Sequence, residues 1–317
     1  WPGPEVWQEL PAPLVEEICR GLLANDIVSF QTGASARNFL LTCTGLLSGV
    51  EADPEGLALS YRGRWTRVRH HPISVDVEEL RQYAASPEVG DHKRQLAPLC
   101  GHRTIVRVDR LDPSKNVLGG FQAFDLFLQR YPQWVGQVSF LAFLVPSRTA
   151  IPEYQAYTQA VFRLAEEINA RHGQPAWQPI RVFNEDSYPQ GIAALSLYDV
   201  LLANPLADGM NLVSKEGPIV NERDGVLVLS RNAGSFEELG GASLPVDPED
   251  IPATAEALAV ALAMPPAKRR ARAGRLRRIV EERDLTSWLA GQLEDLRDVM
   301  ASSHPRPART SGPSRTR

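Results

Sequence analysis

Cysteines and long apolar runs are scarce in this sequence of 317 residues. The three cysteines, Cys19, Cys43 and Cys100, are far apart, with neither Cys-x-x-Cys spacing nor the even number typical of a disulfide framework. We therefore expect buried or idle thiols in a reducing cytoplasm. No apolar run approaches the roughly 20 residues that span a bilayer, and no basic segment followed by an apolar one opens the chain. We expect a cytoplasmic protein without a membrane partner.

An excess of positive charge is also missing. The chain has 34 Lys and Arg against 38 Asp and Glu, a formal net charge of −4, so no basic field favours nucleic acid as a partner. Small molecules are the expected partners, and with 43% hydrophobic residues the chain can bury one large core or two smaller ones. Because the chain opens with Trp1 followed directly by Pro-Gly-Pro, we expect that an N-terminal part of the protein is missing.

The first hundred residues predict one βα layer followed by short strands. Apolar residues at helical spacing indicate helices at 14–23 and 34–47, on either side of a strand at 26–31. Two strands and one further helix are predicted after them, at 57–61, 65–69 and 76–84. The polar stretch 86–98 has few periodic apolar residues, and we interpret it as a domain boundary.

From residue 103 onward, short β-branched runs alternate with longer helical segments. The predicted strands are 104–108, 138–144, 180–183, 200–203 and 226–230, and the predicted helices between them are 117–130, 153–171, 191–197 and 212–220. This alternation is typical of an α/β fold with a doubly wound parallel sheet. Three more helices are predicted at 253–264, 267–282 and 285–300, and the tail 302–317, rich in Ser, Pro and Arg, is predicted to be disordered.

Polar loops follow the predicted strands, where ligands bind in open α/β sheets. In the loop after strand 104–108, Arg110 and Lys115 lie five residues apart across a turn and could reach one anion. An arginine fork and a lysine point charge together suit a diphosphate. The alternative is a helix N-terminus capped by Asp112 or Ser114, with two incidental surface cations.

The loop after strand 200–203 carries the second set of polar residues. Gly209 lets the backbone approach a ligand, and the N–H groups that open the following helix attract phosphate oxygens. Asp208 could accept from sugar hydroxyls and Glu216 from those of a ribose. Alternatively, Asn211 is only an N-cap and Glu216 an acid favoured by the helix dipole, but this leaves Met210 in a polar loop unexplained.

Two further features lie at the same edge of the predicted sheet. The loop 230–238 contains a small-residue turn, which turn chemistry alone could explain. Arg148 follows strand 138–144, and its position suggests a second phosphate site, although a lone arginine there is more often a surface residue.

Taken together, the segments 110–115, 147–148 and 208–216 resemble those of the trehalose-6-phosphate synthase family of retaining glycosyltransferases. Further likeness, at 1–5 and 26–32, extends the resemblance from Trp1 to about residue 296. It implies a GT-B fold whose Rossmann-like donor-binding domain occupies 98–284. Residues 1–97 would be the C-terminal part of a second Rossmann-like domain, 285–301 a C-terminal crossover helix, and 302–317 the disordered tail.

The resemblance also implies roles for individual residues. The implied catalytic residues are Arg110 and Lys115 as a diphosphate clamp and Asp208 as a reader of the donor sugar. The implied donor-binding residues are Gly209, Met210 and Asn211 through their backbone, Leu212 and Val213 through their amides, and Glu216 on the ribose. Arg148 would bind the 6-phosphate of the acceptor. The family uses no metal and no cofactor, and its catalytic histidine would lie just before Trp1.

The reaction implied is transfer of glucose from a nucleoside diphosphate glucose to glucose 6-phosphate with retention, giving trehalose 6-phosphate. Three departures from the family pattern, at Pro113, Asn116 and 184–190, leave UDP and GDP open as the nucleotide. Alternatives are a glucosylglycerol-phosphate synthase, a pseudo-glycosyltransferase, or a non-catalytic relative that binds sugar phosphates. Because most of the N-terminal domain would be missing, we expect the chain alone to bind nucleotide weakly and to lack transferase activity. Helix 285–300 has one apolar face that would lack part of its partner, so we also expect the chain to self-associate as a homo-oligomer.

Overall fold

The computed structural model describes residues 1–53, 55 and 57–302, which form two compact units. The smaller unit contains residues 1–71 and the chain from residue 286, and the larger unit contains residues 72–285. The tail predicted to be disordered lies outside the described residues from residue 303 onward. Among the described residues, no helix is long and apolar enough to cross a membrane.

The smaller unit contains a four-stranded sheet in the order β1-β4-β3-β2. Strand β1 (Ile27–Phe30) runs parallel to β4 (Arg64–His70), and β3 (Ala58–Tyr61) and β2 (Val50–Asp53) continue the sheet antiparallel. The helices of this unit are α1 (Pro4–Trp7), α2 (Ala12–Leu22), α3 (Gly33–Leu46) and most of α13 (Leu285–Ser302). The predicted helix, strand and helix are confirmed, whereas α1 and β2 were not expected from the sequence.

The larger unit contains a six-stranded sheet in which every neighbouring pair is parallel. Its order is β10-β9-β8-β5-β6-β7. The strands are β5 (Arg103–Arg110), β6 (Val138–Val145), β7 (Ile180–Phe183), β8 (Val200–Ala203), β9 (Val226–Ser230) and β10 (Leu244–Val246). The five predicted strands are confirmed, and β10 is an additional edge strand.

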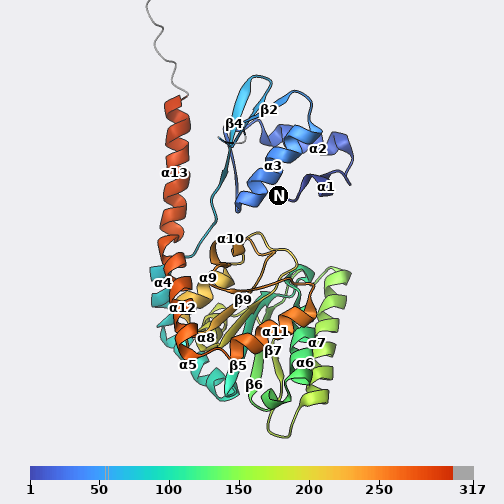
Figure 1. Ribbon diagram of the computed structural model, residues 1–317, viewed down its shortest axis with the longest axis vertical. Coiled ribbons are helices and arrows are strands. Elements are labelled where there is room, and N and C mark those ends of the chain that lie inside the picture. The colour runs from blue at the N-terminus through green and yellow to red at the C-terminus, as the bar shows by residue number, and fades with distance from the viewer. Residues whose placement is uncertain (54, 56, 303–317) are drawn as a thin grey trace, which may run out of the picture. The chain divides into compact units, whose positions relative to one another are not determined.

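Helices cover both faces of this sheet, as Figure 1 shows. On one face pack α6 (Val117–Arg130), α7 (Pro152–His172) and α11 (Ile251–Leu262). On the other face pack α4 (Val77–Ala84), α5 (Pro87–Leu96), α8 (Tyr188–Leu197), α9 (Val213–Val220), α10 (Phe236–Leu239) and α12 (Pro266–Glu282). Each face of the sheet packs against its own hydrophobic core, and successive residues of β5 point to opposite cores. Ile105 belongs to one core and Val106 to the other. The predicted doubly wound arrangement is therefore confirmed.

The polar stretch 86–98 is not an open linker, because most of it forms helix α5. Ser86 caps this helix by accepting a hydrogen bond from the Val89 amide at 3.4 Å, and Pro87 occupies the first turn. Val89 and Leu96 are its two buried side chains, too few to give an obvious helical period. The compact units divide at residue 72, and the domain limits predicted at 97 and 284 stay predictions.

The strand order places a crevice beside β5. Strand β8 pairs with β5, although β6 and β7 come between them in the chain. The connections after β5 and β8 therefore diverge to opposite faces of the sheet. Such a switch point, at the carboxyl ends of parallel strands, is where ligands bind in open α/β folds. The loops 111–116 and 204–212 begin at this point.

Candidate diphosphate site

A tight turn follows β5 and presents Lys115. Asp112 caps the turn, its Oδ1 accepting hydrogen bonds from the amide of Ser114 at 3.0 Å and from its hydroxyl at 2.8 Å. A single 3₁₀ turn (Pro113–Lys115) leads to Asn116, whose φ of 55° is left-handed, and α6 begins at Val117. The capping alternative is therefore present, and the same cap fixes the backbone from which Lys115 extends.

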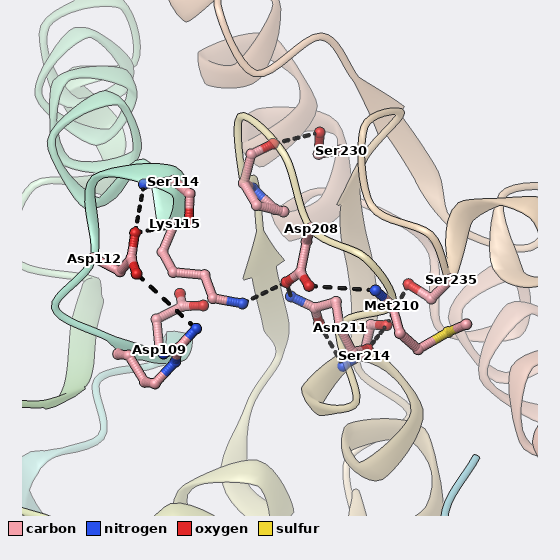
Figure 2. Close-up of polar contacts among 12 residues, drawn as sticks. Asp109, Asp112, Ser114, Lys115, Asp208, Met210, Asn211, Ser214, Ser230 and Ser235 are labelled. Carbon is pink, nitrogen blue, oxygen red and sulfur yellow. Dashed lines mark hydrogen bonds and ion pairs between the residues drawn. The ribbon is translucent and has the colours of Figure 1, made fainter. Parts of the chain in front are cut away.

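The loop after β8 faces this turn. Figure 2 shows the Lys115 ammonium paired with Asp208 Oδ2, across the gap between the two loops. Asp208 is further held by the Met210 amide, 3.3 Å from Oδ1, and by Asn211 Nδ2, 3.1 Å from Oδ2. The structure thus brings together two of the three side chains predicted to be catalytic.

Asn211 orders the start of α9. Its φ of 74° is left-handed, and its Oδ1 accepts a hydrogen bond from the Ser214 amide at 3.0 Å, which is the predicted capping alternative. Because Asn211 turns the chain here, Leu212 and Val213 open α9 with their N–H groups at the helix terminus, where such groups have no partner within the helix.

The loop 230–238 holds the loop after β8 through backbone hydrogen bonds. Asp208 pairs with it through its backbone, its amide donating to Asn232 O at 3.2 Å and its carbonyl accepting from Gly234 N at 2.9 Å. Met210 is buried at 6% exposure, and its carbonyl accepts from the Ser235 amide at 2.8 Å. The methionine is therefore an anchor for the loop. A Cβ at Gly209 would meet no atom within 4 Å, so that side of the loop is open.

A pocket of about 260 Å³ lies between the two loops. Its lining includes Arg110, Lys115, Asn211, Leu212, Val213 and Glu216. The Arg110 side chain is 54% exposed, and its Nη2 lies 4.0 Å from Asp112 Oδ2. Two cations and a helix N-terminus at one pocket suit a phosphate group.

Glu216 stands where this pocket meets a second one. The Tyr188 hydroxyl donates to Glu216 Oε1 at 3.4 Å, and burial raises the pKa of the Glu216 carboxyl. The second pocket, of about 410 Å³, is also lined by Leu212, Tyr83 and Tyr188. The rings of the two tyrosines stack, with their centroids 5.3 Å apart. The sequence reading missed this tyrosine pair, because Tyr83 and Tyr188 come from separate helices.

Arg107 and Asp109 are further residues that the sequence reading missed. The Arg107 side chain is fully buried, with its Nη2 2.8 Å and its Nε 3.1 Å from Asp109 Oδ2. Asp109 lines the pocket, and burial raises the pKa of its carboxyl against the opposing effect of Arg107 and Lys115. The signal in the sequence is an arginine within an apolar strand, with an acid two residues later on the same face.

Arg148 does not line the pocket. It is exposed, has a left-handed φ of 47°, and contacts the hydroxyl and the ring of Tyr154. The Tyr154 hydroxyl in turn donates to Asp112 Oδ2 at 3.2 Å, which links Arg148 to the turn before Lys115. Its role with an acceptor phosphate stays a prediction.

Lys215, within the same motif, points into the protein. It is 1% exposed, its Nζ donates to Ile73 O at 2.9 Å, and it pairs with Glu238 Oε2 at 2.5 Å. Burial lowers the pKa of its ammonium group. Lys215 therefore holds α9 in place and does not face the pocket.

Comparisons with known proteins identify the family of the chain. The sequence model of Glycosyltransferase family 20 matches residues 1–298. A UDP-forming alpha,alpha-trehalose-phosphate synthase of Schizosaccharomyces pombe is 35% identical over 320 residues, covering 100% of this chain and 61% of that protein. A trehalose-6-phosphate synthase of Cronobacter sakazakii is 33% identical, covering 96% of this chain and 64% of that protein.

Solved structures are similar over the same span. A synthase from Burkholderia xenovorans in complex with glucose-6-phosphate has a TM-score of 0.87 at 33% identity, covering 93% of this chain and 66% of that one. The Escherichia coli enzyme bound with UDP-2-fluoro glucose has a TM-score of 0.84 at 30% identity, covering 93% and 65%. The predicted GT-B type fold is thereby confirmed. The chain spans less than two thirds of the length of each of these four relatives, and with a family match over nearly its whole length it belongs to glycosyltransferase family 20.

Proposed function

We propose that the pocket between the β5 and β8 loops binds the diphosphate of UDP-glucose, and that the protein transfers the glucose to glucose 6-phosphate with retention, giving trehalose 6-phosphate. The observation that carries this proposal is the convergence of Lys115, Arg110 and the first turn of α9 on one pocket at the switch point of the sheet. The relatives are named as UDP-forming, which favours UDP over GDP.

The residues that line the pocket, together with Asp208 and Arg148 outside its lining, are assigned different groups of the two substrates. Lys115 and Arg110 neutralise the diphosphate, and the amides of Leu212 and Val213 donate to its oxygens. Glu216 has acceptor capacity for the ribose hydroxyls beyond its contact with Tyr188. Asp208, beside the open surface of Gly209, accepts from hydroxyls of the glucose, and Arg148 binds the acceptor phosphate.

The chemistry assigned to these residues is electrostatic. As the bond between glucose and diphosphate breaks, negative charge grows on the leaving oxygen. Lys115, Arg110 and the N–H groups at the start of α9 stabilise that charge, so they act more strongly in the transition state than in the ground state. Retention follows if the diphosphate leaves and helps to deprotonate the incoming hydroxyl on the same face of the sugar. No carboxylate pair of the kind used by glycosidases is then needed.

Small molecules are thus the proposed partners, and no metal or cofactor is invoked in these roles. Among the described residues, no three His, Cys, Asp or Glu side chains form a group that could hold a metal ion. A cytoplasmic location stays a prediction, as does self-association of the chain.

Calorimetry with UDP tests the proposed site directly. We expect Lys115→Ala to weaken UDP binding by about tenfold or more, as for loss of a hydrogen bond to a charged group. Lys93→Ala is the matched control, because Lys93 also pairs with a carboxylate, Glu222 Oε1 at 2.5 Å, but does not line the pocket. Equal UDP affinity in folded Lys115→Ala and wild type would refute the clamp. In the complete protein, the same substitution should abolish most glucosyl transfer to glucose 6-phosphate.

A further inference from the structure

A buried guanidinium lies beneath the turn that carries Lys115. Arg107, on β5, is 0% exposed and donates to three consecutive backbone carbonyls. Its Nη2 lies 2.9 Å from Lys115 O, and its Nη1 lies 3.5 Å from Asn116 O and 3.4 Å from Val117 O. No ligand can reach this group, so its influence on the pocket passes through the turn and through Asp109.

Gly120 leaves space for the Arg107 side chain, and Asn116 holds the turn on the side away from Arg107. A Cβ at Gly120, on α6, would lie 2.4 Å from Arg107 Nη1, so a larger residue there would displace the guanidinium. Asn116 is held in its left-handed conformation by its Nδ2, which donates to Asn204 O at 3.2 Å and to Pro248 O at 2.8 Å. The backbone that bears Lys115 is therefore fastened to β5 on one side and to the β8 and β10 loops on the other.

The charge of Arg107 has a second consequence for the pocket. The Asp109 carboxylate lines the space where a diphosphate is proposed to bind, and an unpaired carboxylate there would repel it. Arg107 holds Asp109 Oδ2 with two hydrogen bonds, through Nη2 and Nε. The positive charge of Arg107, in direct contact with this carboxylate, opposes that repulsion.

We propose that Arg107 is a positioning residue, which holds the turn 115–117 so that the Lys115 ammonium faces the diphosphate, and which neutralises Asp109 beneath it. This inference rests on the proposed function, because it assumes that the anion in the pocket is the diphosphate of the donor. Arg103, the first residue of β5, does not share the role, because it pairs with Asp199 Oδ1 at 3.1 Å.

A double-mutant cycle between Arg107 and Lys115 tests the proposal. Arg107→Met alone would leave Asp109 buried without a partner, so the test uses Arg107→Met combined with Asp109→Asn, which removes both charges. UDP affinity is measured by calorimetry with and without Lys115→Ala. We expect Lys115→Ala to weaken UDP binding about tenfold or more in the parent, and less than about threefold in the combined variant, as for residues that act through one another.

A purely structural role for Arg107 would lower stability without changing the effect of Lys115→Ala. An equal loss of UDP affinity in both backgrounds would therefore overturn the proposal while leaving the proposed function intact. No effect of Lys115→Ala in the parent would instead refute the proposed function and the inference with it. Arg103→Met serves as the control, with the full Lys115→Ala effect expected in that background. If the combined variant does not fold, Arg107→Lys takes its place, because an ammonium can neutralise Asp109 but cannot span three carbonyls.

Discussion

Replacing Glu216 with glutamine should weaken nucleotide binding and stabilise the unliganded protein. The substitution turns one acceptor oxygen into a donor group, so one hydrogen bond from a ribose hydroxyl to a charged acceptor is lost. Such a bond contributes about 1.5–3 kcal/mol, which corresponds to roughly 10- to 150-fold in UDP affinity. The contact with the Tyr188 hydroxyl survives, since an amide oxygen can still accept it.

The effect on stability has the opposite sign, because burial raises the pKa of Glu216 in the folded protein. Ionised Glu216 then costs stability, and wild-type stability falls as the pH rises through this raised pKa. Glu216→Gln should therefore be more stable than wild type at neutral and higher pH, with the difference shrinking in acid.

Calorimetry with UDP and with pyrophosphate, together with urea unfolding at several pH values, separates these effects. Pyrophosphate lacks a ribose, so its affinity should not change in Glu216→Gln. Glu222→Gln is the control, since Glu222 follows α9 but pairs with Lys93 outside the pocket. An equal loss of affinity for UDP and pyrophosphate, or unchanged UDP affinity, would refute the ribose assignment.

Two other substitutions probe separate parts of the larger unit. Arg148→Ala in the complete protein should raise the KM for glucose 6-phosphate and leave UDP affinity unchanged, because Arg148 lies outside the donor pocket; a fall in UDP affinity by calorimetry would contradict this. Gly225→Ala places a Cβ 2.0 Å from Tyr198 Cε2 in the core and should cost about 1–3 kcal/mol of unfolding free energy in urea; unchanged stability would show that this core can adjust.

Most helices and strands of the larger unit were predictable because the apolar pattern of the sequence matches the residues that are buried. Strands 180–183, 200–203 and 226–230 and helix 117–130 have the same limits in the structure as in the prediction. The strands of a sheet covered on both faces are continuous apolar runs, and a pattern of this kind survives in the sequence. Helix α5 and strand β10 were missed because a partly exposed helix and a three-residue edge strand bury too few side chains to set a period.

The site was predictable in part for a related reason. Residues at strand ends can be found from the strands, so Lys115, Asp208 and Glu216 could be identified before any coordinates. Their partners could not: the pair of Lys115 with Asp208 spans 93 residues, and Arg107 acts on a turn eight residues further along the chain. Sequence spacing does not show which side chains meet when strand order differs from chain order.

The Lys115–Asp208 pair also bears on how the proposed diphosphate would bind. In the structure the Lys115 ammonium already has a carboxylate partner, and its side chain is only 14% exposed. A phosphate must therefore share or replace Asp208, and the free energy of binding is the difference between the two pairings rather than the full attraction to a free cation. When Lys115 turns to phosphate, Asp208 keeps its contacts with Met210 N and Asn211 Nδ2, and it gains acceptor capacity beside Gly209. If the diphosphate binds as proposed, its binding to Lys115 and the release of Asp208 as an acceptor for sugar hydroxyls would be coupled through the Lys115 ammonium group. This coupling would make binding of a complete sugar nucleotide more favourable than the sum of its separate parts.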